Sequence, residues 1–304
     1  MRVVFMGTPD FAVPSLRALS EVHDVTLVVT RPDAVRGRGK RLEPSRVKQA
    51  ATELRLPVLE AKRLSAEDVE RVRQERPDVI CVAAYGAILS DALLAIPPLG
   101  VLNVHASLLP KGRGAAPIQR AVLEGDEVAG VSIMRIVHDL DAGPYCRQAS
   151  VAVGDKPCAQ VMSELAQVGA AELVAALEQL AKGSVVWTDQ DESQVTYAAK
   201  VTKQEMLLDP ADGARANKLR VQASLDAAPA RAIVAGRGVR VLAAAVCNAT
   251  VAQGGVLARK GRVYLGCADG AIELLRVKPD GKREMAASAW ASGLRGDDLT
   301  WERA

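Results

Sequence analysis

The first 190 residues alternate short apolar runs with helix-like stretches, and this alternation constrains the fold more than any other feature of the chain. The apolar runs are rich in β-branched residues, as in strands covered on both faces. They are RVVFMG (2–7), DVTLVVT (24–30), PDVICVAAYG (77–86) and GVLNVH (100–105). Stretches with a helix-start residue and helical apolar spacing lie between them, at 14–22, 44–54 and 65–75. The pattern predicts right-handed crossovers and an α/β, doubly wound, Rossmann-like sheet that is mostly parallel.

The pattern changes after residue 130. Two strand-like runs, 130–137 and 145–153, lie close together and predict added or antiparallel strands. The stretch 158–183 predicts a long amphipathic helix that ends at Gly183. A polar, loop-like stretch follows this helix.

A second domain is expected at the C-terminus. After a helical piece at 212–224, short alternating runs are separated by Gly-rich turns at the spacing of a small, OB-like β-barrel. We therefore predict an α/β domain over 1–188, a linker over 189–208 and a β-barrel domain over 209–304.

Charge is unevenly distributed along the chain. The formal net charge is only +3, yet 31–48 carries seven Lys or Arg against two acidic residues, and 209–304 carries fifteen against ten. A basic loop and a basic C-terminal region on an acidic body suggest a polyanionic partner held at two places. The alternative is ordinary solvated surface charge, and it stays open for both regions.

Several classes of function are disfavoured by the sequence. The first strand–helix turn, MGTPDF (6–11), lacks G-x-G-x-x-G, which argues against NAD or FAD. The five cysteines are widely spaced without a C-x-x-C pair, so we expect no metal site and a cytoplasmic location. We also expect no membrane span or signal peptide, and a monomer, because no heptad or large apolar face calls for a dimer.

Polar side chains gather where ligands of open parallel sheets bind, beyond the carboxyl ends of the strands. Asn103 and His105 are two apart on a strand, so they project to the same side and suit a developing oxyanion. A third group to orient the imidazole is offered by His138, Asp139 or Asp141. A structural role for a histidine at a strand end is the alternative that the residues alone leave open.

The motifs, taken together, resemble the folate-dependent formyltransferases. The segments GTPDFA, RPD with GRGK, AYGAIL, LNVHASLLPKGRGAAPIQRAVLEGD and DLDAGP occur in family order and spacing. The resemblance covers nearly all of 1–205 and continues more thinly from 254, and it is strongest to the members that act on methionyl-tRNA. The chain departs from the pattern at KGRG (111–114), where the family usually carries an aromatic residue, and in the aromatic-poor start of its C-terminal domain.

The resemblance implies a role for particular residues. The catalytic residues are expected to be Asn103, His105 and Asp141. The residues expected to bind the co-substrate, 10-formyltetrahydrofolate, are Tyr85, Gly86, Ser107, Leu108, Leu109 and Pro110. The residues expected to contact initiator methionyl-tRNA, in the basic loop 31–46, are Arg36, Arg38, Lys40 and Arg41. The C-terminal barrel would be a second tRNA contact.

The implied activity is transfer of the formyl group of 10-formyltetrahydrofolate to the α-amine of methionyl-tRNA, which supplies formylmethionyl initiator tRNA for translation initiation. Two alternatives stay open. One is a different amine acceptor, such as glycinamide ribonucleotide or an amino sugar, although a small substrate needs neither the basic loop nor the extra domain. The other is an inactive tRNA-binding module, against which the complete Asn103, His105 and Asp141 set argues.

Overall fold

The computed structural model describes residues 1–36, 41–294, 296 and 298–304. It divides into two compact units. The first comprises Met1–Pro117, Ala129–Ala152 and Met162–Ala198, and the second comprises Ile118–Val128, Val153–Val161 and Ala199–Ala304.

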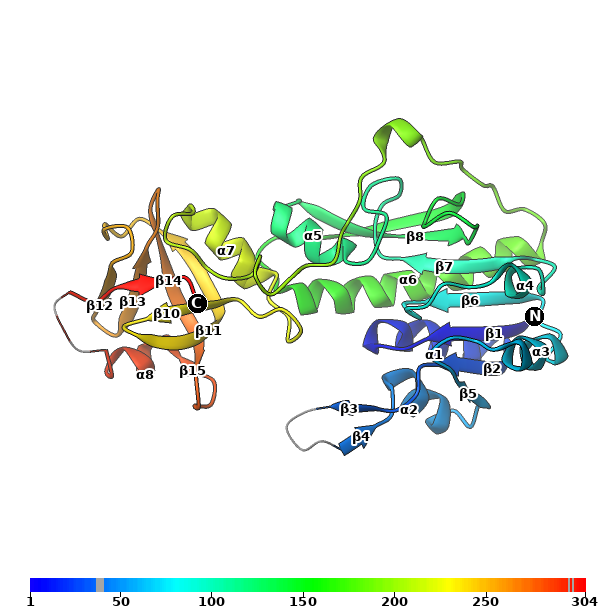
Figure 1. Cartoon of the computed structure of the whole chain (residues 1–304). Helices are drawn as coiled ribbons and strands as arrows, with labels where there is room; N and C mark the ends of the chain where they lie inside the picture. The colour runs from blue at the N-terminus through cyan, green and yellow to red at the C-terminus, as the bar shows by residue number, and fades with distance from the viewer. Residues whose placement is uncertain (37–40, 295, 297) are drawn as a thin grey trace. The chain divides into compact units, whose positions relative to one another are not determined.

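The described part of the first unit is built on a seven-stranded sheet of order β5-β2-β1-β6-β7-β8-β9 (Figure 1). The strands are β1 (Arg2–Gly7), β2 (Asp24–Thr30), β5 (Val58–Glu60), β6 (Val79–Ala83), β7 (Val101–His105), β8 (Val128–Arg135) and β9 (Tyr145–Ala152). The pairs from β5 to β7 are parallel, and β8 pairs antiparallel with β7. The predicted doubly wound, mostly parallel sheet is confirmed.

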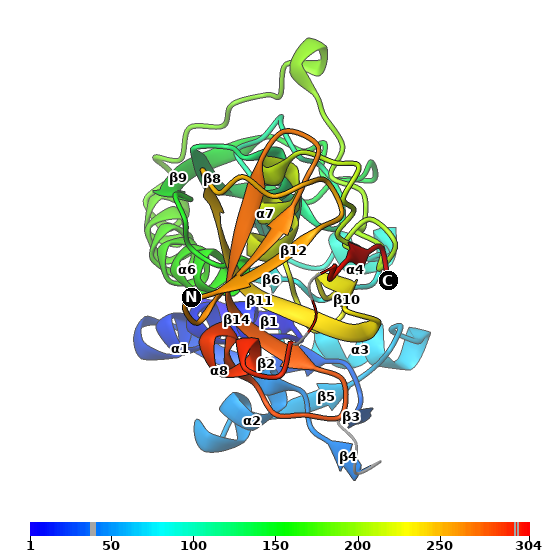
Figure 2. The same ribbon diagram turned by 90° about the vertical axis from the view of Figure 1, so that its left-hand side faces the viewer.

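Helices cover both faces of this sheet, with α1 and α6 on one face and α3 and α4 on the other (Figure 2). The helices up to residue 181 are α1 (Val13–Val22), α2 (Arg46–Glu53), α3 (Ala66–Gln74), α4 (Asp91–Leu94), α5 (Pro117–Glu124) and α6 (Cys158–Ala181), with a 3-10 turn, η1 (Asp10–Ala12). Nearly all of α5 and the start of α6 belong to the second unit. Helix α3 begins at a complete capping box, in which the Ser65 and Asp68 side chains each accept from the other's backbone N–H. Gly183 adopts a left-handed φ of 63° just beyond α6, as expected for a helix stop.

The first turn of the sheet is closed by tight packing. A Cβ on Gly7, at the end of β1, would lie 2.7 Å from the Ala12 Cβ and 2.9 Å from the Ala83 carbonyl oxygen. Only glycine therefore fits where η1 approaches the sheet. This close contact between backbone segments accounts for Gly7 without a bound dinucleotide.

The basic loop contains a short antiparallel hairpin, β3 (Ala34–Arg36) and β4 (Arg41–Glu43). Val35 and Leu42 are paired across it and are 60% and 69% exposed. Two of the basic residues predicted to bind tRNA, Arg38 and Lys40, lie outside the described residues.

The second unit is a small antiparallel barrel, as predicted. Its described strands follow the order β12-β13-β14-β11-β10-β16, with β15 paired to β14 (Figure 1). The elements are α7 (Ala214–Gln222), β10 (Arg231–Val234), β11 (Arg237–Cys247), β12 (Val256–Arg259), β13 (Arg262–Gly266), β14 (Ala271–Pro279), β15 (Met285–Ala286), α8 (Ala287–Ala291) and β16 (Trp301–Glu302). Hydrogen bonds of 2.8 Å from Val256 N to Leu299 O and from Trp301 N to Gly254 O join the two ends of the sheet.

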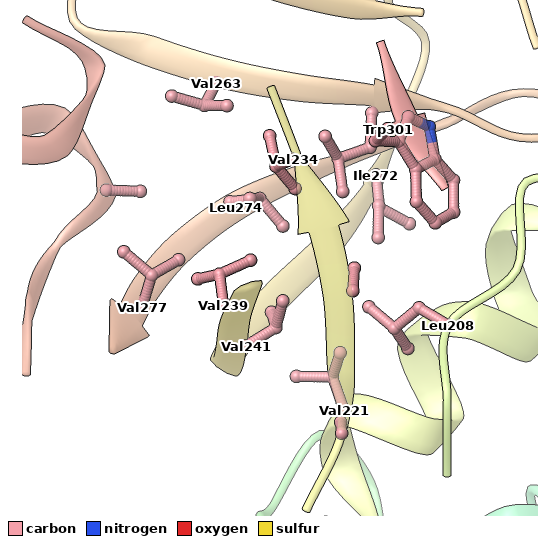
Figure 3. Packing of buried hydrophobic residues seen from close by; sticks show 14 of the residues in the cluster. Leu208, Val221, Val234, Val239, Val241, Val263, Ile272, Leu274, Val277 and Trp301 are labelled. Atoms are coloured by element: carbon pink, nitrogen blue, oxygen red, sulfur yellow. The ribbon is translucent and has the colours of Figure 1, made fainter. Parts of the chain in front are cut away.

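The barrel interior is filled mainly by valine, leucine and isoleucine (Figure 3). This agrees with an aromatic content of only 3%. Trp290 and Trp301 are the aromatic exceptions, and Trp301 is 2% exposed, with its indole Nε1 donating to the Gly266 carbonyl at 2.8 Å. The last strand is thus fixed both by packing and by a buried hydrogen bond.

Candidate active site

The candidate site lies where the strand order of the parallel sheet reverses. Strand β1 has β2 on one side and β6 on the other, and this switch point is where open α/β sheets bind ligands. The loops after β1 and β6 are joined, because the Thr8 hydroxyl donates to the Tyr85 carbonyl at 3.1 Å. The residues after β1 and β6 are therefore tied together, and those after β7 come next to them because β7 pairs with β6.

Asn103 and His105 lie in the C-terminal half of β7 and face the same side of the sheet. They are paired in register with Met134 and Ser132 of β8. His105 is buried, with 5% of its surface exposed, whereas Asn103 is half-buried. Within the described residues the Asn103 amide makes no hydrogen bond, so its N–H groups are available to a ligand.

Asp141 is brought to His105 by a fold-back of the chain. Because β8 is antiparallel to β7, it ends beside the start of β7, at the Leu102–Arg135 pair. The connection after β8 then returns along the sheet and places Asp141 Oδ1 3.6 Å from His105 Nδ1. The other carboxylate oxygen, Oδ2, accepts from the Gly114 N–H at 2.9 Å. Of the three residues offered by this segment, Asp141 is the one that reaches His105.

The partners of the imidazole determine where its protons lie. His105 Nε2 is 3.0 Å from the Gly112 carbonyl oxygen, which only accepts, so Nε2 carries a proton. A neutral ring would then present the Nδ1 lone pair to the Asp141 carboxylate. A second proton, on Nδ1, makes this contact attractive. The 3.6 Å between Nδ1 and Asp141 Oδ1 is the separation of an ion pair rather than of a hydrogen bond.

With this geometry established, comparison with known proteins identifies the family. Residues 1–177 match the model described as formyl transferase, and residues 200–295 match its C-terminal domain. The chain belongs to the formyl transferase family. Similar curated proteins are the methionyl-tRNA formyltransferases of Halorhodospira halophila, 43% identical over 97% of this chain and 96% of that protein, and of Methylococcus capsulatus, 43% identical over 94% and 95%.

A solved structure supports the fold. HypX from Aquifex aeolicus, in complex with tetrahydrofolic acid, superposes with a TM-score of 0.66 at 18% identity. The match covers 99% of this chain and 50% of the HypX chain. At this identity the similarity concerns the fold alone, and it agrees with the sheet and barrel described above.

Side chains of β8 and β9 hydrogen-bond to the loop after β7 in this formyl transferase. The buried Ser132 hydroxyl donates to the Ser107 carbonyl at 2.6 Å and accepts from the Leu109 N–H at 3.1 Å. The Gln148 amide donates to the Leu109 carbonyl at 2.9 Å and to Ser132 Oγ at 2.8 Å. Ser107 also donates its hydroxyl to the Lys111 carbonyl at 2.6 Å.

Side chains of the predicted folate-binding set are thus engaged within the protein itself. Leu109 is 3% exposed, and Leu108 lies against Gly130. The buried Tyr85 hydroxyl donates to the Ala61 carbonyl at 2.9 Å, and burial raises the pKa of this phenol. Ile88, two residues after Gly86, is 97% exposed.

Three residues that sequence reasoning missed support the site. They are Ser132, Gln148 and Gln190, each of which donates to backbone carbonyls of the loops around His105 and Asp141. Arg113, in the segment that departs from the family pattern, is 3% exposed and donates to Gln190 and Glu192. The sequence shows only an arginine between two glycines, and its burial became visible in the structure.

Two further residues do not join the site. His138 is exposed and lies 3.7 Å from the equally exposed Asp91. Asp139 is also exposed.

Among the described residues no group of three or more His, Cys, Asp or Glu side chains is placed to hold a metal ion. All five cysteines are free. No described helix is long and apolar enough to cross a membrane.

Proposed function

We propose that this chain formylates the α-amine of methionyl-tRNA with 10-formyltetrahydrofolate, and that Asn103, His105 and Asp141 carry out the transfer. The observation that supports it most is the Asn103 amide, which makes no hydrogen bond to any residue that the structure describes, beside a buried imidazole in contact with a carboxylate. The close relatives named as methionyl-tRNA formyltransferases support the choice of acceptor.

The reaction needs an electrophile held in place and two protons moved. The amine nitrogen attacks the formyl carbon, a new C–N bond forms, and the carbonyl electrons move onto oxygen. Asn103 donates to this oxyanion, with His105 beside it as a second donor. When the tetrahedral intermediate collapses, the bond to folate N10 breaks and N10 gains a proton, while the former amine loses one. The His105–Asp141 pair supplies and accepts these protons, directly or through water.

For this chemistry His105 must exchange one of its partners. In the ligand-free chain Nε2 donates to the Gly112 carbonyl. Substrate binding would replace that carbonyl with the oxyanion or the leaving nitrogen. Hydrogen bonds of catalytic groups commonly rearrange in this way between the free enzyme and the substrate complex.

We assign the folate to the edge formed by the loops after β6 and β7. Support comes from the order of the chain, because Tyr85 and Gly86 follow β6, and the run Ser107, Leu108, Leu109 and Pro110 follows the neighbouring strand β7. The Ser132 and Gln148 hydrogen bonds would keep that run rigid, because the Ser132 hydroxyl at their centre is fully buried. The structure of HypX, which shares the fold, contains tetrahydrofolic acid.

The tRNA contacts are proposed on the hairpin and the barrel. The hairpin pairs Arg36 with Arg41 in register and exposes the Val35–Leu42 pair, so it offers apolar surface to a nucleic acid within a loop whose sequence is basic. Backbone contacts to a tRNA stem are expected for the aromatic-poor barrel. We further propose that the chain acts as a monomer in the cytoplasm, where aminoacylated tRNA is formed and where its five free cysteines would stay reduced.

A formylation assay with competing acceptors tests this function. The enzyme is supplied with 10-formyltetrahydrofolate and initiator or elongator methionyl-tRNA, with glycinamide ribonucleotide and an amino sugar nucleotide as alternatives. We expect formyl transfer to initiator methionyl-tRNA and none to the small amines. Transfer to a small amine in preference to tRNA would assign a different substrate, and tRNA binding without transfer to any acceptor would indicate an inactive binding module.

A further inference from the structure

We propose that Gln190, fixed by the buried guanidinium of Arg113, is the positioning residue that sets the orientation of Asp141. The inference rests on the proposed role of Asp141 in formyl transfer. It concerns a side chain 49 positions away in sequence, in the segment after α6.

Arg113 provides the fixed point. Its side chain is almost fully buried, and its Nε donates to Gln190 Oε1 at 2.9 Å. Its terminal nitrogens donate to the Glu192 carboxylate at 2.6 and 3.3 Å, so the charge is paired. The Arg113 backbone is also held, because its N–H donates to the Thr196 carbonyl at 2.9 Å and its carbonyl accepts from Ala198 N at 2.7 Å.

This arrangement leaves one orientation for the Gln190 amide. A guanidinium only donates, so the oxygen of the amide must face Arg113 and its nitrogen must face the other way. There Nε2 donates to the carbonyls of Asp141 and Gly143, at 2.7 Å each. Carbonyls only accept, so reversing the amide would lose every one of these bonds.

The backbone that receives these bonds is strained. Asp141 has a φ of 50°, in the left-handed region that residues with a Cβ rarely adopt. Two residues later, a Cβ on Gly143 would lie 1.9 Å from the Arg135 carbonyl oxygen, so the turn has no room to relax in that direction. A strained turn persists only where its surroundings determine it, and Gln190 is the side chain that holds its two carbonyls.

The same loop holds the other end of Asp141. Gly114, next to Arg113, donates its N–H to Asp141 Oδ2 at 2.9 Å, which leaves Oδ1 facing His105. The main chain of Asp141 is thus fixed through Gln190, and its carboxylate is fixed through Gly114. The first contact depends on Arg113, which fixes Gln190, and the second is made by Gly114 itself. Both residues lie in the segment where this chain departs from the family pattern.

Substitutions of Gln190 separate its two functions, since it both accepts from Arg113 and donates to the turn. Gln190→Glu keeps an acceptor for Arg113 but cannot donate to the carbonyls of Asp141 and Gly143. Gln190→Met keeps the approximate length and loses both. The matched control is Gln194→Ala, because Gln194 lies in the same segment, in the turn η2 (Glu192–Gln194), and bonds only to Asp191 among the described residues.

The measurement is kcat and KM for both substrates, with circular dichroism and a melting curve for each variant. We expect kcat to fall roughly 10- to 100-fold in Gln190→Glu and in Gln190→Met, as for a displaced catalytic group. The KM values and the tRNA affinity should stay within about twofold of the parent, and Gln194→Ala should behave like the parent. If Gln190 only anchored its segment to Arg113, Gln190→Glu would keep the parental kcat, and that result would overturn the inference.

An Asp141→Asn variant, assayed in parallel, separates the proposed role of Asp141 in formyl transfer from the positioning role of Gln190. Full activity in that variant would refute the proposed role of Asp141 itself. Loss of activity in Asp141→Asn together with parental kcat in Gln190→Glu would refute only the positioning role. A fall in kcat that merely matches a loss of folded protein in the melting curves would also count against positioning.

Discussion

The buried hydroxyl of Ser132 allows the rigidity of the folate loop to be tested quantitatively. Ser132 lies on β8, has no exposed surface, and joins three groups: the Ser107 carbonyl, the Leu109 N–H and the Gln148 amide. Ser132→Ala removes the hydroxyl without introducing bulk. The Gln148 amide keeps its bond to the Leu109 carbonyl, but the Ser107 carbonyl and the Leu109 N–H lose their buried partner.

The expected cost follows from these two backbone groups. Each unsatisfied buried group costs about 1–3 kcal/mol, and removing a buried hydroxyl recovers part of that. We therefore expect the variant to lose about 2–3 kcal/mol in the free energy of opening this loop. Since about 1.4 kcal/mol corresponds to a factor of ten, the amide of Leu109 should exchange roughly 30- to 150-fold faster.

Hydrogen exchange followed by mass spectrometry, on a peptide that contains Leu109, measures this directly. The KM for 10-formyltetrahydrofolate should rise in the same variant, because the loop proposed to line its site is loosened. The control is Ser184→Ala, whose exposed hydroxyl makes a single 3.4 Å bond to the Gln179 carbonyl. Equal exchange rates in Ser132→Ala and the parent would refute the reasoning, as would an unchanged folate KM alongside faster exchange.

Other predictions concern the barrel and the basic loop. Trp301→Ala should destabilise the barrel by about 3–5 kcal/mol, measured as a shift in its urea transition by Trp290 fluorescence; an unchanged midpoint would contradict the packing described. Glu205, whose pKa is lowered to about 2 by the Thr202 N–H and then by Arg120, stabilises the folded chain above its ordinary pKa. That contribution should fade as pH falls from about 4.5 toward 2, and Glu205→Gln should remove this part of the pH dependence in urea titrations between those values. Replacing the four basic loop residues by Gln should weaken tRNA binding and reduce the slope of log K against log salt by roughly 3, whereas an unchanged slope would exclude the loop from the interface. These residues are Arg36, Arg38, Lys40 and Arg41.

The fold was predictable to the extent that local patterns determine it. Continuous apolar runs such as 24–30 coincide with strands because burial on both faces requires them, and Ser65 with Asp68 marks the start of α3 because its capping groups are adjacent in sequence. The short helices α4 and α5 and the hairpin of the basic loop were not predicted. Helix α4 has four residues and each hairpin strand has three, too few for their periodicity to stand out from that of a polar loop.

The site was predictable only in part, for a similar reason. Asn103 and His105 share a face of one strand, so their proximity follows from spacing. The approach of Asp141 depends on a fold-back after β8 that no local pattern specifies. The residues alone offered His138, Asp139 or Asp141, and only the family resemblance singled out Asp141. Gln190 could not have been found, since nothing in its own neighbourhood indicates that the chain after α6 returns to Arg113.

The most direct test of the central claim is the single-turnover rate of formyl transfer in Asn103→Ala and Asp141→Ala, with both substrates saturating. Loss of one oxyanion donor costs about 10²–10³ in rate, and loss of a proton-transfer group about 10²–10⁴. We therefore predict rates at least 100-fold below the parent in both variants, with tRNA dissociation constants within about twofold. Transfer at the parental rate, or a loss of tRNA affinity as large as the loss of rate, would contradict the account.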